Sequence, residues 1–190
     1  MEINPIEIQG NWNRGFVLDK HVLSSVPTGE DVYGHIQYDT KRTRLGELVY
    51  QLKYRGRPEC AEEILELIKP FFDDFSELKD INVIIPVPPS KDRSIQPVEE
   101  IGRAVAKYLG KSFNNEVLVK VIDAQSKDME KSSKNLEGSI EMKIKAKATA
   151  NILLIDDLFA TGKTISECVS VLRSDPMVKK IYVLVMTKTK

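Results

Sequence analysis

The sequence predicts an α/β fold in which a parallel sheet carries helices on both faces. Nearly continuous apolar runs at residues 81–87, 151–155 and 181–186 are typical of strands that are buried on both faces. Between these runs, apolar residues repeat with helical spacing over residues 98–109 and 164–173. Alternating strands and helices favour a parallel sheet, and such sheets bind ligands beyond the carboxyl ends of their strands. We therefore expect the functional residues at that edge.

Two further helices are expected before the first of these strands. The earlier helix has apolar residues at positions i, i+3, i+4 and i+7, namely Leu45, Leu48, Val49 and Leu52. The later helix is expected to begin at Pro58, because proline is tolerated in the first helical turn. Its apolar side consists of Ile64, Leu67, Ile68 and Phe71. Residues 116–122 predict one more strand.

The first forty residues differ in character from the rest. Glycine, proline, asparagine and aspartate interrupt short apolar runs there, which predicts short strands and turns. We expect residues 1–40 to form a small β-containing extension or hood, and residues 41–190 to form the main α/β domain. A chain of 190 residues is long enough to bury one hydrophobic core without disulfides.

The composition excludes several classes of function. Lysine and arginine number 28, as do aspartate and glutamate, and this balance disfavours direct nucleic-acid binding. No apolar run approaches the roughly 18 residues of a membrane span. The two cysteines, Cys60 and Cys168, are too far apart in sequence to suggest a zinc motif. We expect a cytoplasmic protein that binds no membrane.

The strongest motif is the segment 151–164, NILLIDDLFATGKT, which predicts a sugar-phosphate site. A buried strand ends at the carboxylates Asp156 and Asp157, and a short loop then opens a helix. Backbone N–H groups at a helix N-terminus favour a phosphate. A glycine in the loop lets the backbone approach the phosphate closely, and hydroxyl and lysine side chains add hydrogen-bond donors for it. The loop residues are Ala160, Thr161, Gly162, Lys163 and Thr164. The two carboxylates suit the vicinal hydroxyls of a ribose.

Two other interpretations of this segment compete with the sugar-phosphate site. Gly162, Lys163 and Thr164 match the end of a nucleotide-binding P-loop, but the first glycine of that motif would fall at Asp157. A P-loop would also place two carboxylates beside a triphosphate. Alternatively, Asp156 and Asp157 could merely cap the following turn.

Residues 152–164 resemble the phosphoribosyl-pyrophosphate (PRPP) loop of the type I phosphoribosyltransferases, with a strand, an acidic pair and a TGxT phosphate loop. The stretches RTRLGEL at 42–48, LKY at 52–54 and IPVPPS at 85–90 are similar to the ComF-type (competence protein F) branch. The resemblance covers roughly residues 40–187. It implies the type I phosphoribosyltransferase fold.

The resemblance also implies roles for individual residues. Asp156 and Asp157 would hold the ribose hydroxyls, and residues 160–164 would hold the 5-phosphate. The turn after the strand at residues 81–87 would bind pyrophosphate through Pro88, Pro89 and Ser90. Lys91 and Arg93 would be the cations that stabilise this leaving group. A mobile catalytic loop would contain Lys127, Lys131 and Lys134, although an ordinary charged loop explains these lysines equally well. Mg²⁺ would arrive on the pyrophosphate, with no direct protein ligand.

Two departures from the family pattern leave alternatives open. Residues 1–40 contain no cysteine, so the cysteine zinc module usual in ComF-type proteins is absent. Pro88 and Pro89 remove two N–H donors from a loop that should bind pyrophosphate. We expect a phosphoribosyltransferase that uses Mg-PRPP and an unidentified base or amine. The alternative is a PRPP-binding regulator, or a ComF-like adaptor in DNA uptake with a helicase-like protein partner. A homodimer is also possible by resemblance.

Overall fold

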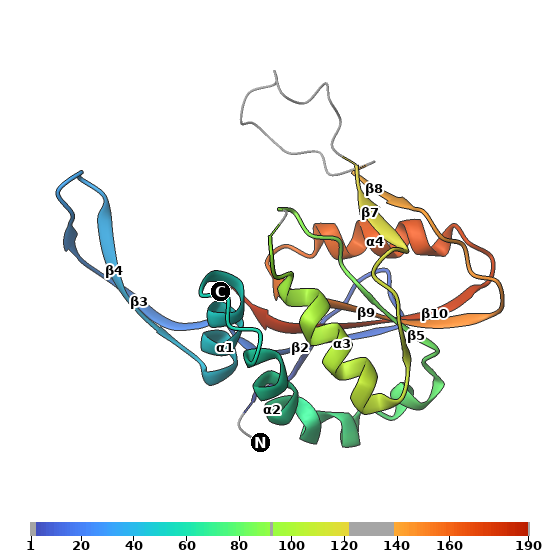
Figure 1. The fold of residues 1–190 in the computed structure, drawn as a ribbon. Helices are drawn as coiled ribbons and strands as arrows, with labels where there is room; N and C mark the ends of the chain where they lie inside the picture. Colours follow the sequence, from blue (N-terminus) through green and yellow to red (C-terminus); the bar gives the residue numbers. More distant parts are fainter. Residues whose placement is uncertain (1–2, 92, 122–138, 190) are drawn as a thin grey trace.

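The computed structural model describes residues 3–91, 93–121 and 139–189, and its centre is a six-stranded sheet (Figure 1). The strands lie in the order β1, β2, β10, β9, β5, β6. Their bounds are β1 Ile6–Glu7, β2 Arg14–Lys20, β10 Val178–Lys188, β9 Ala150–Phe159, β5 Val83–Pro86 and β6 Ser112–Phe113. Only the edge strand β1 is antiparallel among these pairings. The predicted α/β class with a parallel core is confirmed.

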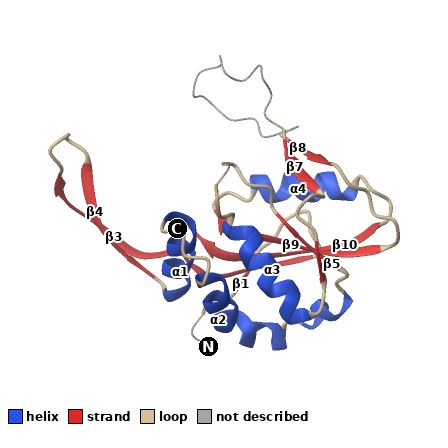
Figure 2. Ribbon diagram, viewed as in Figure 1, coloured by secondary structure: helices blue, strands red, loops and turns tan. Residues whose placement is uncertain are grey.

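Helices cover both faces of this sheet (Figure 2). One face packs against three helices, α1 Arg44–Tyr54, α2 Cys60–Asp74 and α3 Pro97–Leu109. The other face packs against α4 Lys163–Arg173 and a small antiparallel pair, β7 Leu118–Lys120 and β8 Ile140–Met142. A 3₁₀ helix, Ser76–Asp80, links α2 to the sheet. Within the described ranges, none of the helices has the length and apolar character needed to cross a membrane.

The predicted helices agree closely with the observed ones, and several helix and strand ends differ from the prediction by a few residues. Helix α2 begins at Cys60, because Pro58 lies in the preceding turn, where its carbonyl accepts a hydrogen bond from the Ala61 N–H at 3.0 Å. Strand β9 continues to Phe159, past its predicted end at residue 155. The continuation follows from parallel pairing with β10, which extends beyond the acidic pair to the end of the strand. Pairing with a neighbouring strand thus overrides the weak strand preference of aspartate.

The strand order of the sheet reverses between the neighbouring strands β5 and β9. From β5 the chain runs through α3 to β6 on one side, whereas from β9 it runs through α4 to β10 on the other side. Strands β5 and β9 are neighbours, with Pro86 opposite Ile155. Where strand order reverses in this way, the loops leaving the two carboxyl ends diverge and form a crevice.

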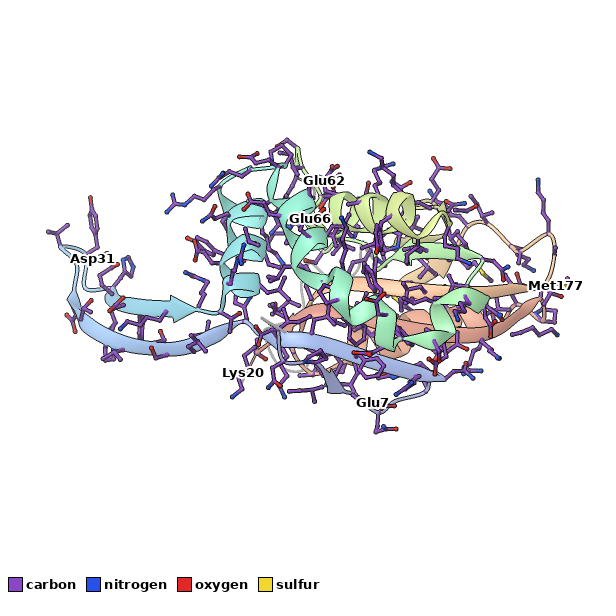
Figure 3. The ribbon with its side chains drawn as sticks, turned by 90° about the horizontal axis from the view of Figure 1, so that it is seen from below. Glu7, Lys20, Asp31, Glu62, Glu66 and Met177 are labelled. Carbon is purple, nitrogen blue, oxygen red and sulfur yellow. The ribbon has the colours of Figure 1, made fainter. Side chains whose placement is uncertain are left out.

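The first forty residues are divided between two places. Strand β2 lies inside the central sheet beside β10, whereas β3 Val22–Glu30 and β4 Ile36–Arg42 form a separate hairpin. The predicted β content of this segment is confirmed, and the hairpin projects from the body in both views (Figures 1 and 3). The expected domain boundary at residue 40 stays a prediction.

Helix α1 packs very closely against the chain that leaves β2. The hydroxyl of Thr43, the N-cap residue, donates to the Lys20 carbonyl at 2.6 Å and accepts from the Gly46 N–H at 2.9 Å. A Cβ atom on Gly46 would lie 2.2 Å from the His21 carbonyl oxygen. Only glycine therefore allows α1 to lie this close to the sheet.

Replacing Gly46 with alanine tests this packing. Alanine favours an isolated helix by about 1 kcal/mol over glycine, so helix propensity alone would raise stability. We expect Gly46→Ala instead to lower the free energy of unfolding by about 1–3 kcal/mol, because the methyl group meets rigid backbone. Urea denaturation measures the change. The control Lys107→Ala, at an exposed position of α3, should stay within about 0.5 kcal/mol of wild type; an equal or higher stability of Gly46→Ala would contradict the packing.

Candidate functional site

A pocket lies in the crevice between the carboxyl ends of β5 and β9. Its walls come from the loop after β5, the start of α3, the end of β9, the first turn of α4, and single residues of α1 and β7. The lining residues are Lys53, Val87, Pro88, Pro89, Ser90, Arg93, Gln96, Pro97, Val98, Glu99, Lys120, Asp156, Asp157, Leu158 and Thr164. The pocket thus lies at the edge where the sequence predicted a ligand.

The two carboxylates of β9 form the floor of this pocket. Asp157 is only 7% exposed, and its side chain accepts a hydrogen bond from the Lys53 ammonium, with 2.5 Å between Nζ and Oδ2. Asp156 accepts a hydrogen bond from the Asp157 backbone N–H at 2.8 Å. Successive side chains of a strand point to opposite faces, so Asp157 lies toward α1 while Asp156 lies toward α4. The pair therefore presents oxygen acceptors on both sides of the strand end.

Burial raises the pKa of Asp156 to about 8, and the charge of Asp157 adds to this effect. The Asp157 N–H and the Lys53 ammonium oppose it more weakly. The raised pKa favours the protonated form of Asp156 in the free protein, and in that form the pair can donate as well as accept a hydrogen bond. Such a perturbed acid in a crevice is typical of functional sites.

Hydrogen bonds from neighbouring segments hold the backbone at the end of β9. The buried Thr187 hydroxyl donates to the Asp157 carbonyl at 3.1 Å, and His21 Nδ1 lies 3.0 Å from the same hydroxyl. Burial, and next the Arg42 charge, lower the pKa of His21, which keeps this ring neutral at physiological pH. The backbone that carries the acidic pair is thus held by an uncharged network.

The loop after β9 leads to the N-terminus of α4. Gly162 is the N-cap residue, at φ 74°, a conformation that favours glycine, and a Cβ atom there would lie 2.9 Å from the Phe159 ring. Thr164 lines the pocket, while Ala160 and Thr161 on the loop and Lys163 at the start of α4 are exposed. A helix N-terminus with neighbouring hydroxyl and ammonium groups favours an anion.

The loop after β5 forms the opposite wall. Pro88, Pro89 and Ser90 line the pocket, as expected from their place in the sequence, and both prolines follow trans peptide bonds. Arg93 also lines the pocket, but the side chain of Lys91 is exposed outside it. Of the two cations predicted for this wall, the structure brings only Arg93 to the pocket. The predicted loop lysines Lys127, Lys131 and Lys134 lie outside the described residues.

Four polar residues of the pocket were missed by sequence reasoning: Lys53, Gln96, Glu99 and Lys120. Lys53 follows Val49 by four positions, so it continues the inward side of α1. Lys120 follows the buried Leu118 by two positions on β7 and shares its face. A cation on an apolar face was the available signal in both cases. Glu99 is held by hydrogen bonds from Asn115 at 2.8 Å and Arg103 at 3.1 Å.

The pocket therefore combines charges of both signs. Its cations are Lys53, Arg93 and Lys120, and its carboxylates are Glu99, Asp156 and Asp157. Among the residues that the structure describes, no three His, Cys, Asp or Glu side chains gather closely enough to hold a metal ion. The arrangement suits a ligand that carries both anionic groups and hydroxyl groups.

Comparison with solved structures finds proteins of similar fold. Two are adenine phosphoribosyltransferases: one is 15% identical with a TM-score of 0.46, covering 86% of each chain. The other, from Thermoanaerobacter pseudethanolicus, is 16% identical with a TM-score of 0.43, covering 88% of this chain and 95% of that chain. The phosphoribosylpyrophosphate synthetase of Mycobacterium smegmatis is 15% identical with a TM-score of 0.43 over 65% of this chain, which spans 32% of the synthetase.

No protein-family model and no curated protein matches the chain. At the low identities and TM-scores of the structural matches, similarity carries no argument about function. The functional argument therefore rests on the geometry of the crevice. The predicted ComF-type specificity stays a prediction.

The Lys53–Asp157 ion pair can be tested with a double-mutant cycle. Lys53→Met and Asp157→Asn should each leave the remaining partner of the ion pair poorly paired in a mostly buried place. The double variant removes both charges. We expect a coupling free energy of about 1–2 kcal/mol from urea denaturation of the four proteins. The exposed pair Arg57–Glu59, with 2.7 Å between Nε and Oε1, is the control and should show no measurable coupling. Equal coupling in both pairs would contradict a special role for Lys53.

The pKa of Asp156 predicts an unusual dependence of stability on pH. Between pH 6.5 and about 8, the unfolded chain has Asp156 ionised while the folded protein still holds its proton. Stability should therefore fall as pH rises through this window, by at most about 1.4 kcal/mol per pH unit. Asp156→Asn cannot titrate, so the difference between the two proteins isolates this group from His21, which titrates at lower pH. Parallel stability curves for wild type and variant would show that the pKa is not raised.

Proposed function

We propose that this protein binds PRPP together with Mg²⁺ in the crevice between β5 and β9 and transfers the phosphoribosyl group. One observation carries the proposal: the same pocket joins a carboxylate pair, a helix N-terminus and a set of cations. PRPP has the matching distribution, since its ribose hydroxyls lie between a 5-phosphate and a pyrophosphate. A ligand that carried only phosphates would be repelled by the two carboxylates and would offer them no hydroxyl groups to bind.

The ribose would lie over the end of β9. Asp156 and Asp157 would bind its two free hydroxyls, and the protonated carboxyl of Asp156 would add a donor to the acceptors of Asp157. The 5-phosphate would bind at the N-terminus of α4, near Thr164 and the backbone of residues 160–164. Lys53 would orient Asp157 through the ion pair present in the structure.

The pyrophosphate would lie against the loop after β5. Arg93 and Lys120 supply positive charge there, which offsets the two N–H donors lost at Pro88 and Pro89. Mg²⁺ fits this donor set because it keeps several waters and binds through substrate phosphates, so it needs no cage of protein ligands. The pocket carboxylates that could hold its waters are Glu99 and Asp157. When bound, the metal would neutralise charge on the leaving pyrophosphate.

The chemistry needs no covalent nucleophile. The bond from C1 of the ribose to the pyrophosphate oxygen breaks with its electron pair leaving on pyrophosphate, and the ribose gains positive oxocarbenium character. Arg93 and Lys120 would stabilise the leaving group, while Asp156 and Asp157 would fix the sugar for attack at C1. A base nitrogen or an amine would form the new bond to C1 and give up its proton to the departing pyrophosphate or to water. Catalysis would thus come from positioning and charge rather than from a covalent intermediate.

Calorimetric titration with two ligands separates the parts of this site. Asp157→Asn should weaken binding of both Mg-PRPP and ribose 5-phosphate at least tenfold, a loss of about 1.4 kcal/mol or more. Arg93→Gln should weaken binding of Mg-PRPP by a similar factor but leave ribose 5-phosphate unchanged, because only PRPP carries pyrophosphate. The exposed Asp73→Asn is the matched control for the first change.

Two outcomes would contradict the assignment. Wild-type protein that binds neither ligand would remove PRPP as the substrate, and unchanged affinities in Asp157→Asn would remove the carboxylates from the site. Release of pyrophosphate from PRPP, measured with a panel of bases and amines, then separates the enzyme from a PRPP-binding regulator or adaptor. Tight binding without pyrophosphate release would favour the regulator.

A further inference from the structure

Lys120, a cation of the pocket, lies on a very small sheet. It is the last residue of β7, and β7 and β8 have three residues each. Within the described residues these two strands pair only with each other. An isolated two-stranded sheet is only marginally stable in water. The position of the Lys120 ammonium therefore depends on the contacts that hold β8 in place beside β7.

The first residues of the β8 segment support Lys120. Ile140 lies directly opposite Lys120 in the antiparallel register, so the two side chains lie on the same side of the ladder. Ile140 is 3% exposed and packs in the apolar layer between the central sheet and α4. Next to this pair, the Val121 N–H donates to the Ser139 carbonyl at 2.8 Å. A displacement of Ser139 and Ile140 would therefore displace Lys120.

A half-buried carboxylate on α4 holds both of these residues. Helix α4 lies beside β7 and β8 (Figure 1), and its Glu167 Oε1 accepts hydrogen bonds from the N–H groups of Ser139 at 2.7 Å and Ile140 at 3.2 Å. The Ser139 hydroxyl donates to Oε2 at 3.0 Å. Hydrogen bonds to a carboxylate are roughly twice as strong as those between neutral groups. Glu167 thus fixes the start of β8 to the helix.

The same helix provides the proposed site for the 5-phosphate. Thr164 lines the pocket in the first turn of α4, and Glu167 follows it by three positions, so the two residues are neighbours on the helix surface. Lys120 is therefore connected through β8 to the helix whose N-terminus would bind the phosphate. Glu167 itself is not part of the pocket wall. Any effect it has on a ligand must pass through the groups that it holds.

We propose that Glu167 is a positioning residue for Lys120: by fixing Ser139 and Ile140 to α4, it holds the Lys120 ammonium toward the pyrophosphate of PRPP. The inference rests on the proposed function, because it requires pyrophosphate to lie beside Lys120. A lysine side chain has large conformational freedom, which an ordered support reduces before the ligand binds. Without the bonds to Glu167, the ammonium is spread over more positions and binds pyrophosphate less tightly.

Calorimetry on four proteins tests whether Glu167 acts through Lys120. The proteins are wild type, Glu167→Ala, Lys120→Met and the double variant, each titrated with Mg-PRPP and with ribose 5-phosphate. Lys120→Met should weaken binding of Mg-PRPP about tenfold and Glu167→Ala about fivefold, whereas neither should weaken binding of ribose 5-phosphate. In the double variant the loss should equal that of Lys120→Met alone, because the group that Glu167 positions is gone.

Two further variants separate this positioning role from other effects of the substitution. Glu167→Gln removes the same charge as Glu167→Ala but keeps an acceptor oxygen, so it should recover part of the affinity for Mg-PRPP. Glu141→Ala removes an exposed glutamate of β8 and should bind both ligands as wild type does. Hydrogen exchange of the Val121 amide needs no ligand and should become at least fivefold faster in Glu167→Ala only. Thermal unfolding of each variant shows that it is folded.

Four results would overturn the inference while the proposed function stands. These are unchanged Mg-PRPP affinity in Glu167→Ala, equal weakening of both ligands, a loss in the double variant that is the sum of the single losses, and unchanged exchange of the Val121 amide. Wild type that binds neither ligand would instead overturn the proposed function and this inference together. The two kinds of failure are therefore distinguishable in the same experiment.

Discussion

The parallel pairing of β5 with β9 is the constraint on which the candidate site depends. Pro86 and Ile155 lie in register, so both strands end at the same edge of the sheet. The following helices carry the chain away in opposite directions, toward β6 and toward β10, and this divergence opens the crevice. Pro88 and Asp156 are therefore neighbours although they are far apart in sequence. The pocket is a consequence of strand order.

The same edge of the sheet carries two adjacent carboxylates, Asp156 and Asp157, and a lysine from another element compensates their charge. Adjacent carboxylates at a buried strand end are costly, and the ammonium of Lys53 offsets that cost from α1. Lys53 can reach Asp157 because α1 lies unusually close to the sheet, which Gly46 permits beside the His21 carbonyl. A glycine without any contact to ligand thus helps to set the electrostatics of the site.

Much of the fold and part of the site could be predicted from the sequence because the signals are local. Apolar spacing predicted the helices and the buried strands, and the Asp156–Asp157 pair before a helix predicted the floor of the pocket. Lys53 and Lys120 were missed because they reach the pocket from distant elements. The place of β2 was also missed, since its parallel partner β10 lies at the other end of the chain. Such pairings depend on the whole fold, which local spacing does not encode.

An NMR titration of the ¹⁵N-labelled protein with Mg-PRPP tests the central claim most directly, because it reports the position of the ligand residue by residue. If PRPP binds in the crevice, the amide signals of residues 160–165 and of Asp156, Asp157 and Lys53 should shift together and saturate. Those of the hairpin tip, such as Tyr33, should not move. Shifts that are absent at saturating ligand, or confined to other parts of the molecule, would contradict the account.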